Sequence, residues 1–536
     1  MQSPQRQWSP DIWHRAHRDP VSIGIGAISL FEGATGVAVG FEAASLVGSS
    51  LLIGGALTLS YAAQALQKRG QGSTVDTSLN DNSIKFSERQ AIPRQRIIYA
   101  TSQVGGSLFF EQAKPPYLYH GFLICAEKVS AFRQMWVGSN LINFGGITPG
   151  GILSPVAVDG QPDYQNGLKA SFRLGDRDQL IDPLLQADFA SLDASFRQRG
   201  VATVVVRYDY GANFDVFTKR WGQVQKPNPL WLVDGIAIPD PRKAGHILNW
   251  NPDDPDSVAE AQGSWSWSNN ASLVKAHYLT QKYGGRIKPS RMDWDKVAQS
   301  ADFDDDLIYC KDGTFQRRYT IDGVVTMNQQ PAQIISGMIA ANRAFVLQES
   351  GKCWPGSARP LTPLTTITDR DLTGAVSIRG AKPKKDLINR VKTRMIAPDQ
   401  EYQEVDGPIL SRADLQGIDG EILDATLDLP YTVDHRRGQR LAKPYLETSR
   451  LGKQITARLH VDFLARLNDK LIGSVVNWQS ELFANGNGTY QVSDWGFSDG
   501  YAAIDVSLLQ YDGSIETAWN AEVDEQDFAF SDLNVS

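Results

Sequence analysis

The sequence has little cysteine, and the three cysteines that it contains cannot build a disulfide framework. Cys125, Cys310 and Cys353 lie far apart in a chain of 536 residues, and their number is odd. Their spacing also excludes a CxxC-type zinc site, and it favours assembly in a reducing compartment. The chain lacks a strong excess of one charge too, because 53 Lys and Arg residues stand against 60 Asp and Glu residues. A net charge of −7 argues against a dedicated nucleic-acid-binding protein.

The common motifs of catalysis and cofactor binding are missing as well. The sequence contains no GxSxG nucleophile elbow, no GxxxxGK[ST] phosphate loop and only 7 His residues. His14 and His17 lack a third ligand nearby, so we expect them to be solvated. The acidic run 302–306 lacks the glycine turn and distal Glu of an EF-hand loop, so we expect a solvated loop. We predict no catalytic, cofactor-binding or metal-binding residues, and a scaffold rather than an enzyme.

One long stretch with almost no charge stands out. Residues 21–67 contain eight glycines and no Lys, Arg or Asp. The uncharged part, 43–67, is long enough to cross a bilayer, which takes about 20 residues, but Ser, Thr and Gly dilute its apolarity. It is a membrane span, a membrane-active segment stored until needed, or a helical arm packed against other copies of the chain. We favour the last two together, and the candidate channel-closing or membrane-active residues are Phe31, Glu32, Phe41, Glu42, Leu51, Leu52 and Ile53.

After residue 84 the pattern changes to short strand-like runs separated by Gly, Pro and Asn. Two such runs flank Gly105 and Gly106, which predicts a hairpin or a β-arch. Residues 117–129 form a nearly continuous apolar run, typical of a strand buried on both faces, and residues 201–210 are strongly β-branched. Four further runs between 453 and 511 predict a small antiparallel barrel or sandwich.

Helical patterns are fewer. Residues 270–283 begin with a candidate cap, Asn270, and residues 331–345 begin with a proline suited to a first turn. Residues 434–450 also look helical, but Gly438 and Pro444 predict a kink or break. The Trp-rich stretch 263–270 resembles a sugar-stacking platform, but we favour packed aromatic residues leading into the Asn270 cap. The acidic residues after 520 are expected to form a loose tail.

Four passages of the sequence, which together span about residues 85–520, carry a resemblance to a known family. The first is IPRQRIIYA with VGG (92–106) and the strand after it, and the second is VDG, DPR and WSNNA up to Tyr283-Gly284 (233–284). The third is RYTIDGVV with the helix from Pro331 and KCW (318–354), and the fourth is LINRV, LPY and RLA (387–442). In this order they resemble the central tail hub or baseplate hub of long-tailed phages, including the hub part of the lambda-like tail tip attachment protein J. The family passage WSxNPA has a proline directly after the asparagine, whereas here Ala271 and Ser272 follow Asn270 and no proline is present. The motif positions are Arg96, Gly105, Asp240, Pro241, Arg242, Trp267, Asn269, Tyr319, Gly323, Asn389 and Arg440.

The resemblance implies an α+β fold that is predominantly β. It implies a multidomain hub with two tube-like antiparallel β-barrels, smaller α+β modules and an N-terminal helical hydrophobic arm. The expected domains are a leader with the arm (1–70), a linker (71–84), a first hub barrel module (85–235), a connecting module with a helix (236–300), an α+β module (301–400), a second hub module with C-terminal barrel strands (401–520) and an acidic tail (521–536).

The resemblance also implies a function. Hubs of this family are homotrimeric structural virion proteins that join the tail tube or distal tail ring to the tip, close the tail channel and open for genome ejection. The implied protein partners are the distal tail protein or tail tube ring, the tape measure protein, and tip or fibre proteins that attach the particle to the host. The passing DNA is a further implied partner, and so is the host membrane, through the arm. No cofactor is expected, and the expected location is the virion tail tip after assembly in the host cytoplasm. The alternative is a membrane-anchored cell-surface hydrolase or adhesin.

Overall fold

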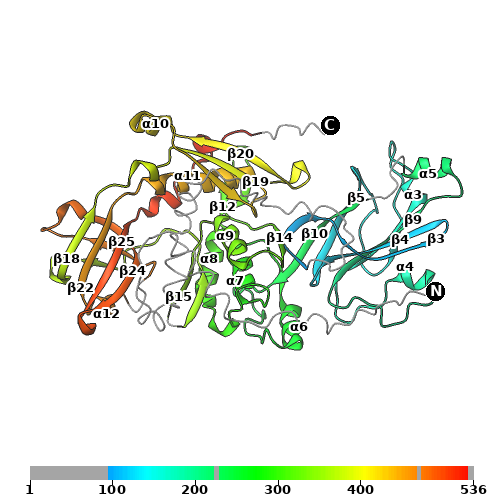
Figure 1. Ribbon diagram of the computed structural model, residues 1–536, viewed down its shortest axis with the longest axis horizontal. Coiled ribbons are helices and arrows are strands. Elements are labelled where there is room, and N and C mark those ends of the chain that lie inside the picture. The colour runs from blue at the N-terminus through cyan, green and yellow to red at the C-terminus, as the bar shows by residue number, and fades with distance from the viewer. Residues whose placement is uncertain (1–94, 222–227, 350, 468–471, 529–536) are drawn as a thin grey trace.

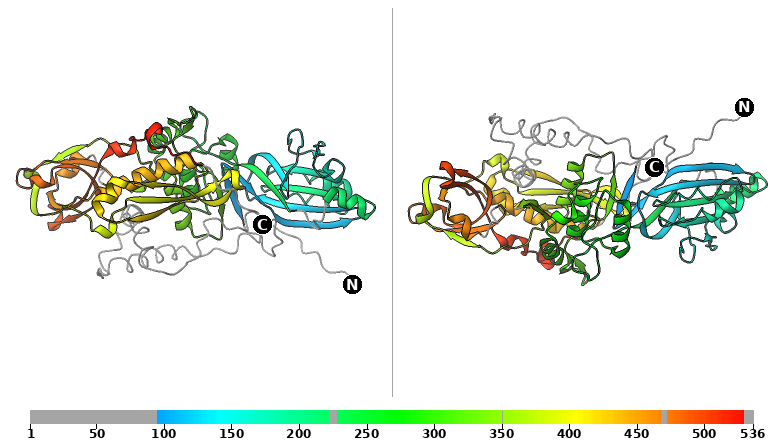
Figure 2. Two further views of the ribbon diagram at one scale, coloured as in Figure 1. Left: turned by 90° about the horizontal axis from the view of Figure 1, so that it is seen from above. Right: turned by 90° about the horizontal axis from the view of Figure 1, so that it is seen from below.

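The computed structural model describes residues 95–221, 228–349, 351–467 and 472–528. The described chain forms an elongated body with a curled β-sheet structure at each end and a mainly helical part between them (Figure 1). A smaller sheet with a long helix lies along one side of the middle part, as the two views of Figure 2 also show. The predicted α+β fold with a predominance of strands is therefore confirmed.

The first end is built from two facing five-stranded sheets. The aromatic pairs Phe122–Trp231 and Phe132–Phe172 join them, with ring centroids 5.1 and 5.2 Å apart. One sheet contains β3 (Ser107–Lys114), β4 (Tyr117–Cys125), β9 (Ala202–Asp209), β8 (Leu168–Arg173) and β7 (Ile152–Leu153). The other contains β2 (Thr101–Val104), β5 (Val129–Val137), β6 (Asn140–Leu141), β10 (Pro229–Ile238) and β11 (Ser266–Trp267). Short helices accompany them: α3 (Tyr164–Gly167), α4 (Pro183–Asp188) and α5 (Phe214–Trp221).

The glycine pair between β2 and β3 forms an arch between the two sheets. Strand β2 pairs with β10, and β3 pairs with β4, so the two strands do not pair with each other. A Cβ atom on Gly106 would lie 2.6 Å from the Cβ atom of Phe122. The β-arch prediction is confirmed, and the hairpin alternative is wrong because the chain must cross between layers here.

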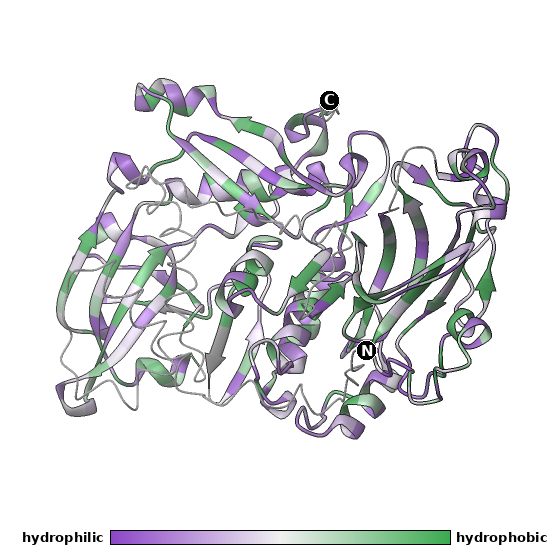
Figure 3. Cartoon of the chain, turned by 45° about the vertical axis from the view of Figure 1, so that its right-hand side comes forward, coloured by the Kyte–Doolittle hydropathy of each residue, from purple (hydrophilic) through white to green (hydrophobic). Residues whose placement is uncertain are grey.

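Strands β4 and β9 are covered on both faces, as their apolar sequences predict. Helix α4 places Leu184 and Leu185 on the outer face, against Tyr119 and Val205. The inner face packs into the main core, which includes Phe122. Figure 3 shows green, hydrophobic residues along the strands of this end, interrupted by purple, hydrophilic ones.

The middle part contains the predicted helices in slightly shorter form. The Asn270 side chain caps α7 (Ala271–Thr280) by accepting hydrogen bonds from the backbone N–H groups of Ser272 and Leu273, at 3.1 and 3.2 Å. The cap prediction is confirmed, and every residue of α7 is buried. The remaining helices and strands here are α6 (Pro255–Ser264), α8 (Trp294–Asp305), α9 (Pro331–Ala340), β12 (Leu307–Tyr309), β13 (Phe315–Arg317), β15 (Val346–Glu349) and β16 (Lys352–Pro355).

Strand β1 (Arg96–Tyr99) ties the first end to the middle part. It pairs with β14 (Gly323–Thr326), which follows more than 200 residues later. It also crosses β10 so closely that a Cβ atom on Gly235 would lie 1.9 Å from the carbonyl oxygen of Ile98. The two parts therefore share one continuous hydrophobic core.

Helix α11 (His435–Arg450) lies on a three-stranded sheet of β20 (Gln403–Ser411), β19 (Arg390–Ala397) and β21 (Asp424–Leu429). The helix continues through Pro444, so the expected break is wrong. Burial of Leu441 and Leu446 against this sheet offsets the hydrogen bond that the proline removes, which costs about 3 kcal/mol. Helix α10 (Ala413–Asp419) stands beside the sheet.

The other end is a six-stranded curled sheet with a core of its own. Its edge strands β17 and β18 are neighbours in sequence, separated by a short turn at Asp369–Asp371. The sheet therefore curls until its two edges lie near each other, as the barrel pattern of the sequence predicts. Its order is β17 (Thr365–Ile367), β23 (Val475–Trp478), β24 (Gly488–Ser498), β25 (Ala503–Gln510), β22 (Gln454–His460) and β18 (Leu372–Arg379), with α12 (Phe463–Arg466) beside it.

Glu127, just after β4, makes stability depend on pH. Its carboxylate accepts a hydrogen bond from Gln262 at 3.0 Å, and burial raises its pKa from 4.5 to about 7. Because the folded state holds this proton more tightly, the stability contribution is complete below pH 4.5 and is lost as pH rises through 7. We expect Glu127→Gln to increase the free energy of unfolding at pH 8 by up to about 3 kcal/mol, and therefore to raise the thermal midpoint there. At pH 4 both quantities should change little.

The measurement is thermal unfolding of both proteins between pH 4 and pH 8. Glu260→Gln, an exposed position on α6, is the matched control and should follow the parent protein at every pH. Equal pH profiles for Glu127→Gln and the parent protein would show that Glu127 is not the titrating group.

Candidate functional site

The Asp240-Pro241-Arg242 motif clamps the loop after β10 to the end of helix α8. Arg242 donates to both carboxylate oxygens of Asp240, at 2.9 and 3.0 Å, and also to Asp302 and Asp305, at 3.1 and 2.9 Å. Burial acts to raise the pKa of Asp240, but the hydrogen bonds and charge of Arg242 lower it overall. Asp302 and Asp305 lie in the last turn of α8, so the expected solvated loop is wrong for this acidic run.

A second group of motif residues holds β13 and the segment that follows it. Asn269 accepts a hydrogen bond from Arg317 at 2.9 Å, and Arg440 of α11 donates to the side chain of Gln316 at 2.8 Å. Arg440 also donates to the carbonyl oxygens of Arg317 and Arg318, and burial lowers its pKa to about 10. These bonds attach α11 to the middle part of the chain.

Two further motif residues support this segment by close packing. Tyr319 is fully buried, with 1% of its surface exposed. Gly323 begins β14, where a Cβ atom would lie 2.6 Å from the Tyr431 ring. Trp267 lies on β11, which pairs with β10.

The remaining motif residues lie apart from this junction. Arg96 donates to the carbonyl oxygen of Gly105 at 2.9 Å inside the first end. Asn389 directly precedes β19, and its amide donates to Asp419 and to the carbonyl oxygen of Glu421, at 2.8 and 2.9 Å. The motif positions thus form several buried contacts between segments rather than one site. The arm residues Phe31, Glu32, Phe41, Glu42, Leu51, Leu52 and Ile53 lie outside the described residues.

A buried polar cluster that was not predicted from the sequence lies between α7, α8 and the turn after α9. Lys275 donates to the side-chain oxygen of Asn342 at 2.6 Å and to the carbonyl oxygen of Gly356 at 3.0 Å. The Asn342 amide nitrogen lies 3.1 and 3.3 Å from the two carboxylate oxygens of Asp304. The only signals in the sequence were a lysine inside an apolar helix pattern and an aspartate at the end of α8.

Two serines complete this cluster around Asp304. Ser272 donates to the carboxylate through its backbone N–H, at 2.8 Å, and its hydroxyl, at 2.6 Å, and Ser357 donates through its hydroxyl at 2.6 Å. Asp304, Ser272 and Ser357 are at most 1% exposed. Burial raises the pKa of Asp304 and lowers the pKa of Lys275 to about 7.

Exposed apolar side chains gather in three surface patches, a pattern typical of binding surfaces. The outward face of the β12–β13 hairpin carries Leu307, Tyr309 and Phe315, with the two rings 5.6 Å apart. The β24–β25 turn carries Phe497 and Tyr501, with ring centroids 5.0 Å apart.

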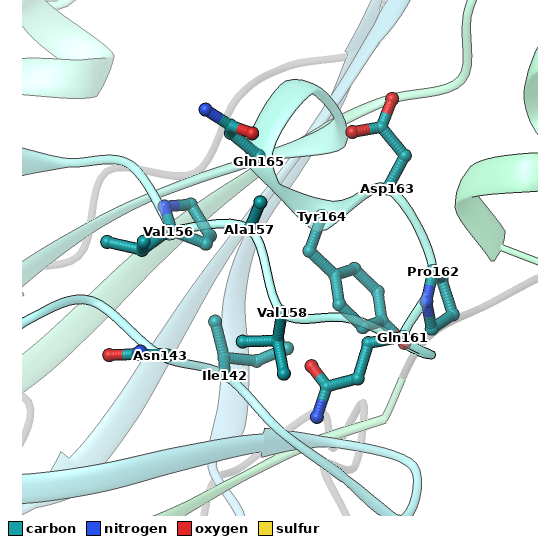
Figure 4. Close-up of a pocket in the computed structure, with 11 residues that line it drawn as sticks. Ile142, Asn143, Val156, Ala157, Val158, Gln161, Pro162, Asp163, Tyr164 and Gln165 are labelled. Carbon is teal, nitrogen blue, oxygen red and sulfur yellow. The ribbon is translucent and has the colours of Figure 1, made fainter.

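The third patch lies beside a pocket in the first end (Figure 4). The pocket has a volume of about 210 Å³, and Ile142, Val156, Val158 and Tyr164 are among the residues that line it. Val156 and Val158 are themselves 51% and 38% exposed. Its walls mix these apolar residues with the polar residues Asn143, Gln161, Asp163 and Gln165, and it is large enough for one side chain of a partner.

The first residues of the predicted acidic tail are docked, so the expectation of a loose tail is wrong for residues 521–528. Helix α13 (Ala521–Asp524) begins this segment, and Asp524 accepts a hydrogen bond from Lys443 at 2.6 Å. Gln526 exchanges backbone hydrogen bonds with the Gln439 side chain, at 2.7 and 3.0 Å. Polar contacts to α11 hold the segment in place. Because these contacts are not apolar, the hydrophobicity pattern of the sequence could not reveal the docking.

Among the described residues, no group of three or more His, Cys, Asp and Glu side chains is placed to hold a metal ion. Nor does this part of the chain include a helix that is both long and apolar enough to cross a membrane.

No known protein-family model and no curated protein matches the sequence. Solved structures do resemble the fold. A chain described as "Virion of native gene transfer agent (GTA) particle" matches with a TM-score of 0.55 at 14% identity, covering 93% of this chain and 98% of that chain.

Two bacterial proteins match more weakly. The tail protein from Neisseria meningitidis MC58 has a TM-score of 0.29 at 10% identity, covering 80% of this chain and 100% of its own. The prophage MuSo2 43 kDa tail protein from Shewanella oneidensis has a TM-score of 0.27 at 8% identity, covering 77% and 93%. Of these three likenesses, the first is close enough to show a shared fold, and it extends over nearly the whole of both chains.

Proposed function

We propose that this chain is a structural component of a phage tail or a tail-like particle. The observation that carries the proposal is the likeness of fold, over nearly the whole of both chains, to a chain of a gene transfer agent virion. The order of the four sequence passages supports the same role, because they resemble the hub family from about residue 85 to residue 520. Within the tail we assign the chain to the central hub of the tip or baseplate.

In this role three copies form a ring around the tail channel. The curled sheets at the two ends of each protomer supply six similar units, which face the tail tube or the distal tail ring with pseudo-sixfold symmetry. An obligate ring of this kind buries more than about 2,000 Å² at its interfaces. The three apolar patches are candidates for the centres of these contacts, because burying them in assembly removes apolar surface from water.

The N-terminal arm closes the channel in this proposal. Small residues in 21–67 allow three copies to approach closely, and Glu32 and Glu42 then need neutral partners or protonation. When the channel opens, the tape measure protein and the DNA pass through, and the arm is free to contact the host membrane. Separate tip or fibre proteins bind the host receptor.

The experiment that tests the hub is the mass of the purified full chain in solution. We expect a particle of three times the 59.0 kDa protomer mass, and negative-stain images of a ring with a central closure. Dilution should not release monomers at micromolar concentration, because obligate interfaces of this size persist there. A stable monomer, alone and together with a tail tube protein, would contradict the hub and leave a peripheral tail role.

A further inference from the structure

A lysine, an asparagine and an aspartate meet in the interior of the middle part, where none of them faces water. Lys275, Asn342 and Asp304 are each at most 1% exposed, and Asn342 lies between the other two. We propose that Lys275 and Asn342 become joined by an intramolecular isopeptide bond, with Asp304 transferring the proton. This inference concerns the chemistry of the folded chain and does not rest on the proposed function.

The geometry brings the nucleophile to the amide that it attacks. The Lys275 nitrogen lies 2.6 Å from the Asn342 side-chain oxygen, in contact with the group whose carbon is the electrophile. Holding two reacting groups together in this way replaces a bimolecular encounter and supplies several kcal/mol of the barrier. The amide orientation follows from its neighbours, because the oxygen faces a donor and the nitrogen faces a carboxylate.

The contacts of Lys275 fit an uncharged amine. Its nitrogen makes two hydrogen bonds, to Asn342 and to the carbonyl oxygen of Gly356, and an uncharged amine carries two N–H hydrogens. Burial lowers the pKa of this lysine to about 7, so the free amine is populated at neutral pH. Asp304 hydrogen-bonds to Asn342, rather than forming an ion pair with the lysine.

The reaction balances without any further reagent. The lysine nitrogen attacks the Asn342 side-chain carbon, and the proton that it loses passes to the Asp304 carboxylate. Asp304 then delivers this proton to the Asn342 amide nitrogen, 3.1 Å away, which leaves as ammonia. One N–C bond forms, one C–N bond breaks, and nothing is oxidised or reduced. Ser272 and Ser357 hold the carboxyl group in place, because their hydroxyls can either donate to it or accept from it.

The bond would join α7 to the turn after α9 and close a loop between positions 67 residues apart in sequence. These elements lie in the part of the chain that connects the two curled ends (Figure 1). A covalent link there resists unfolding of the middle part when force pulls the two ends apart, provided that the backbone is not cleaved.

The decisive measurement is mass spectrometry of the purified full chain under denaturing conditions. We expect a mass lower than that of the sequence by one ammonia, about 17 Da. Trypsin should release residues 244–282 and 319–343 as one linked species, because cleavage after Lys275 is blocked. An unshifted mass would overturn the proposal, and so would a loss of ammonia without this linked species, because succinimide formation at an Asn-Gly sequence causes the same loss.

Variants assign the roles of the three residues. Lys275→Met and Asp304→Asn should each show the mass expected from the sequence, without the loss of ammonia. The first variant lacks the nucleophile, and the second lacks the proton carrier. Asp322→Asn is the matched control, because Asp322 is also buried, its pKa is also raised by burial, and it hydrogen-bonds to Thr320 outside the cluster. The control should keep the ammonia loss and the linked peptides. A linked product that persists in Asp304→Asn would contradict the assigned role of Asp304.

Discussion

Deletion of residues 21–67 is expected to leave assembled particles that fail to deliver their genome. The described body, which begins at residue 95, contains the sheets and apolar patches to which we assign the proposed ring contacts, so we expect the ring to form without the arm. The arm is the longest stretch with almost no charge, and the proposed closure depends on three copies of it packing together. Genome delivery per particle should fall by orders of magnitude, whereas particle number should fall far less.

The measurement compares particle counts from electron microscopy with transferred genomes, in the phage or particle that carries the gene. The matched control replaces the polar linker 71–84 with a Gly/Ser segment of equal length. This control should deliver genomes normally, because the linker needs only to span its distance. Normal delivery by the 21–67 deletion would remove the arm from the mechanism and leave the hub itself untouched.

Gly235→Ala is expected to loosen the joint between the first end and the middle part. The added Cβ atom would lie 1.9 Å from the carbonyl oxygen of Ile98, and side-chain carbons do not approach closer than 3.0 Å. Strand β1 must therefore move away from β10, which also strains the hydrogen bond from the Gly235 N–H to the carbonyl oxygen of Ala100. We expect a loss of about 3 kcal/mol and a first thermal transition about 10 °C lower.

Calorimetry or circular dichroism of the purified chain measures this shift. Gly263→Ala is the control, because Gly263 lies in α6 with no atom within 4 Å of its added Cβ. Alanine is the better helix former, so this substitution should be neutral or slightly stabilising. Equal midpoints for Gly235→Ala and Gly263→Ala would mean that the joint tolerates a shift of β1 at no energetic cost.

Local patterns in the sequence predicted the elements whose stability is decided locally. The Asn270 cap and the strand predicted at 201–210 are present in the structure, and the apolar run 117–129 contains β4, which ends earlier than predicted, at Cys125. The break predicted at Pro444 and the solvated loop predicted at 302–306 were wrong. In both cases tertiary contacts decide the outcome: a buried helix face for the proline and Arg242 for the acids.

The functional positions were less predictable, because they depend on partners distant in sequence. Arg242 and Arg440, which lie in the passages that resemble the hub family, hold segments together, but nothing local showed which segments they join. Lys275 illustrates the same limit. Its place in an apolar helix pattern was visible, but Asn342 and Asp304, 67 and 29 residues away, give it its chemistry.

The pairing of β1 with β14 also dictates the order in which the molecule can fold. Synthesis of the residues between Tyr99 and Gly323 takes tens of seconds at about 5–20 residues per second, and β1 has no β14 to pair with during that time. Pairings of such large sequence separation also close slowly, because much chain entropy is lost before any contact forms. The nascent chain therefore carries an unpaired strand of the sequence RIIY until the middle part emerges, and this is where a chaperone would be expected to bind.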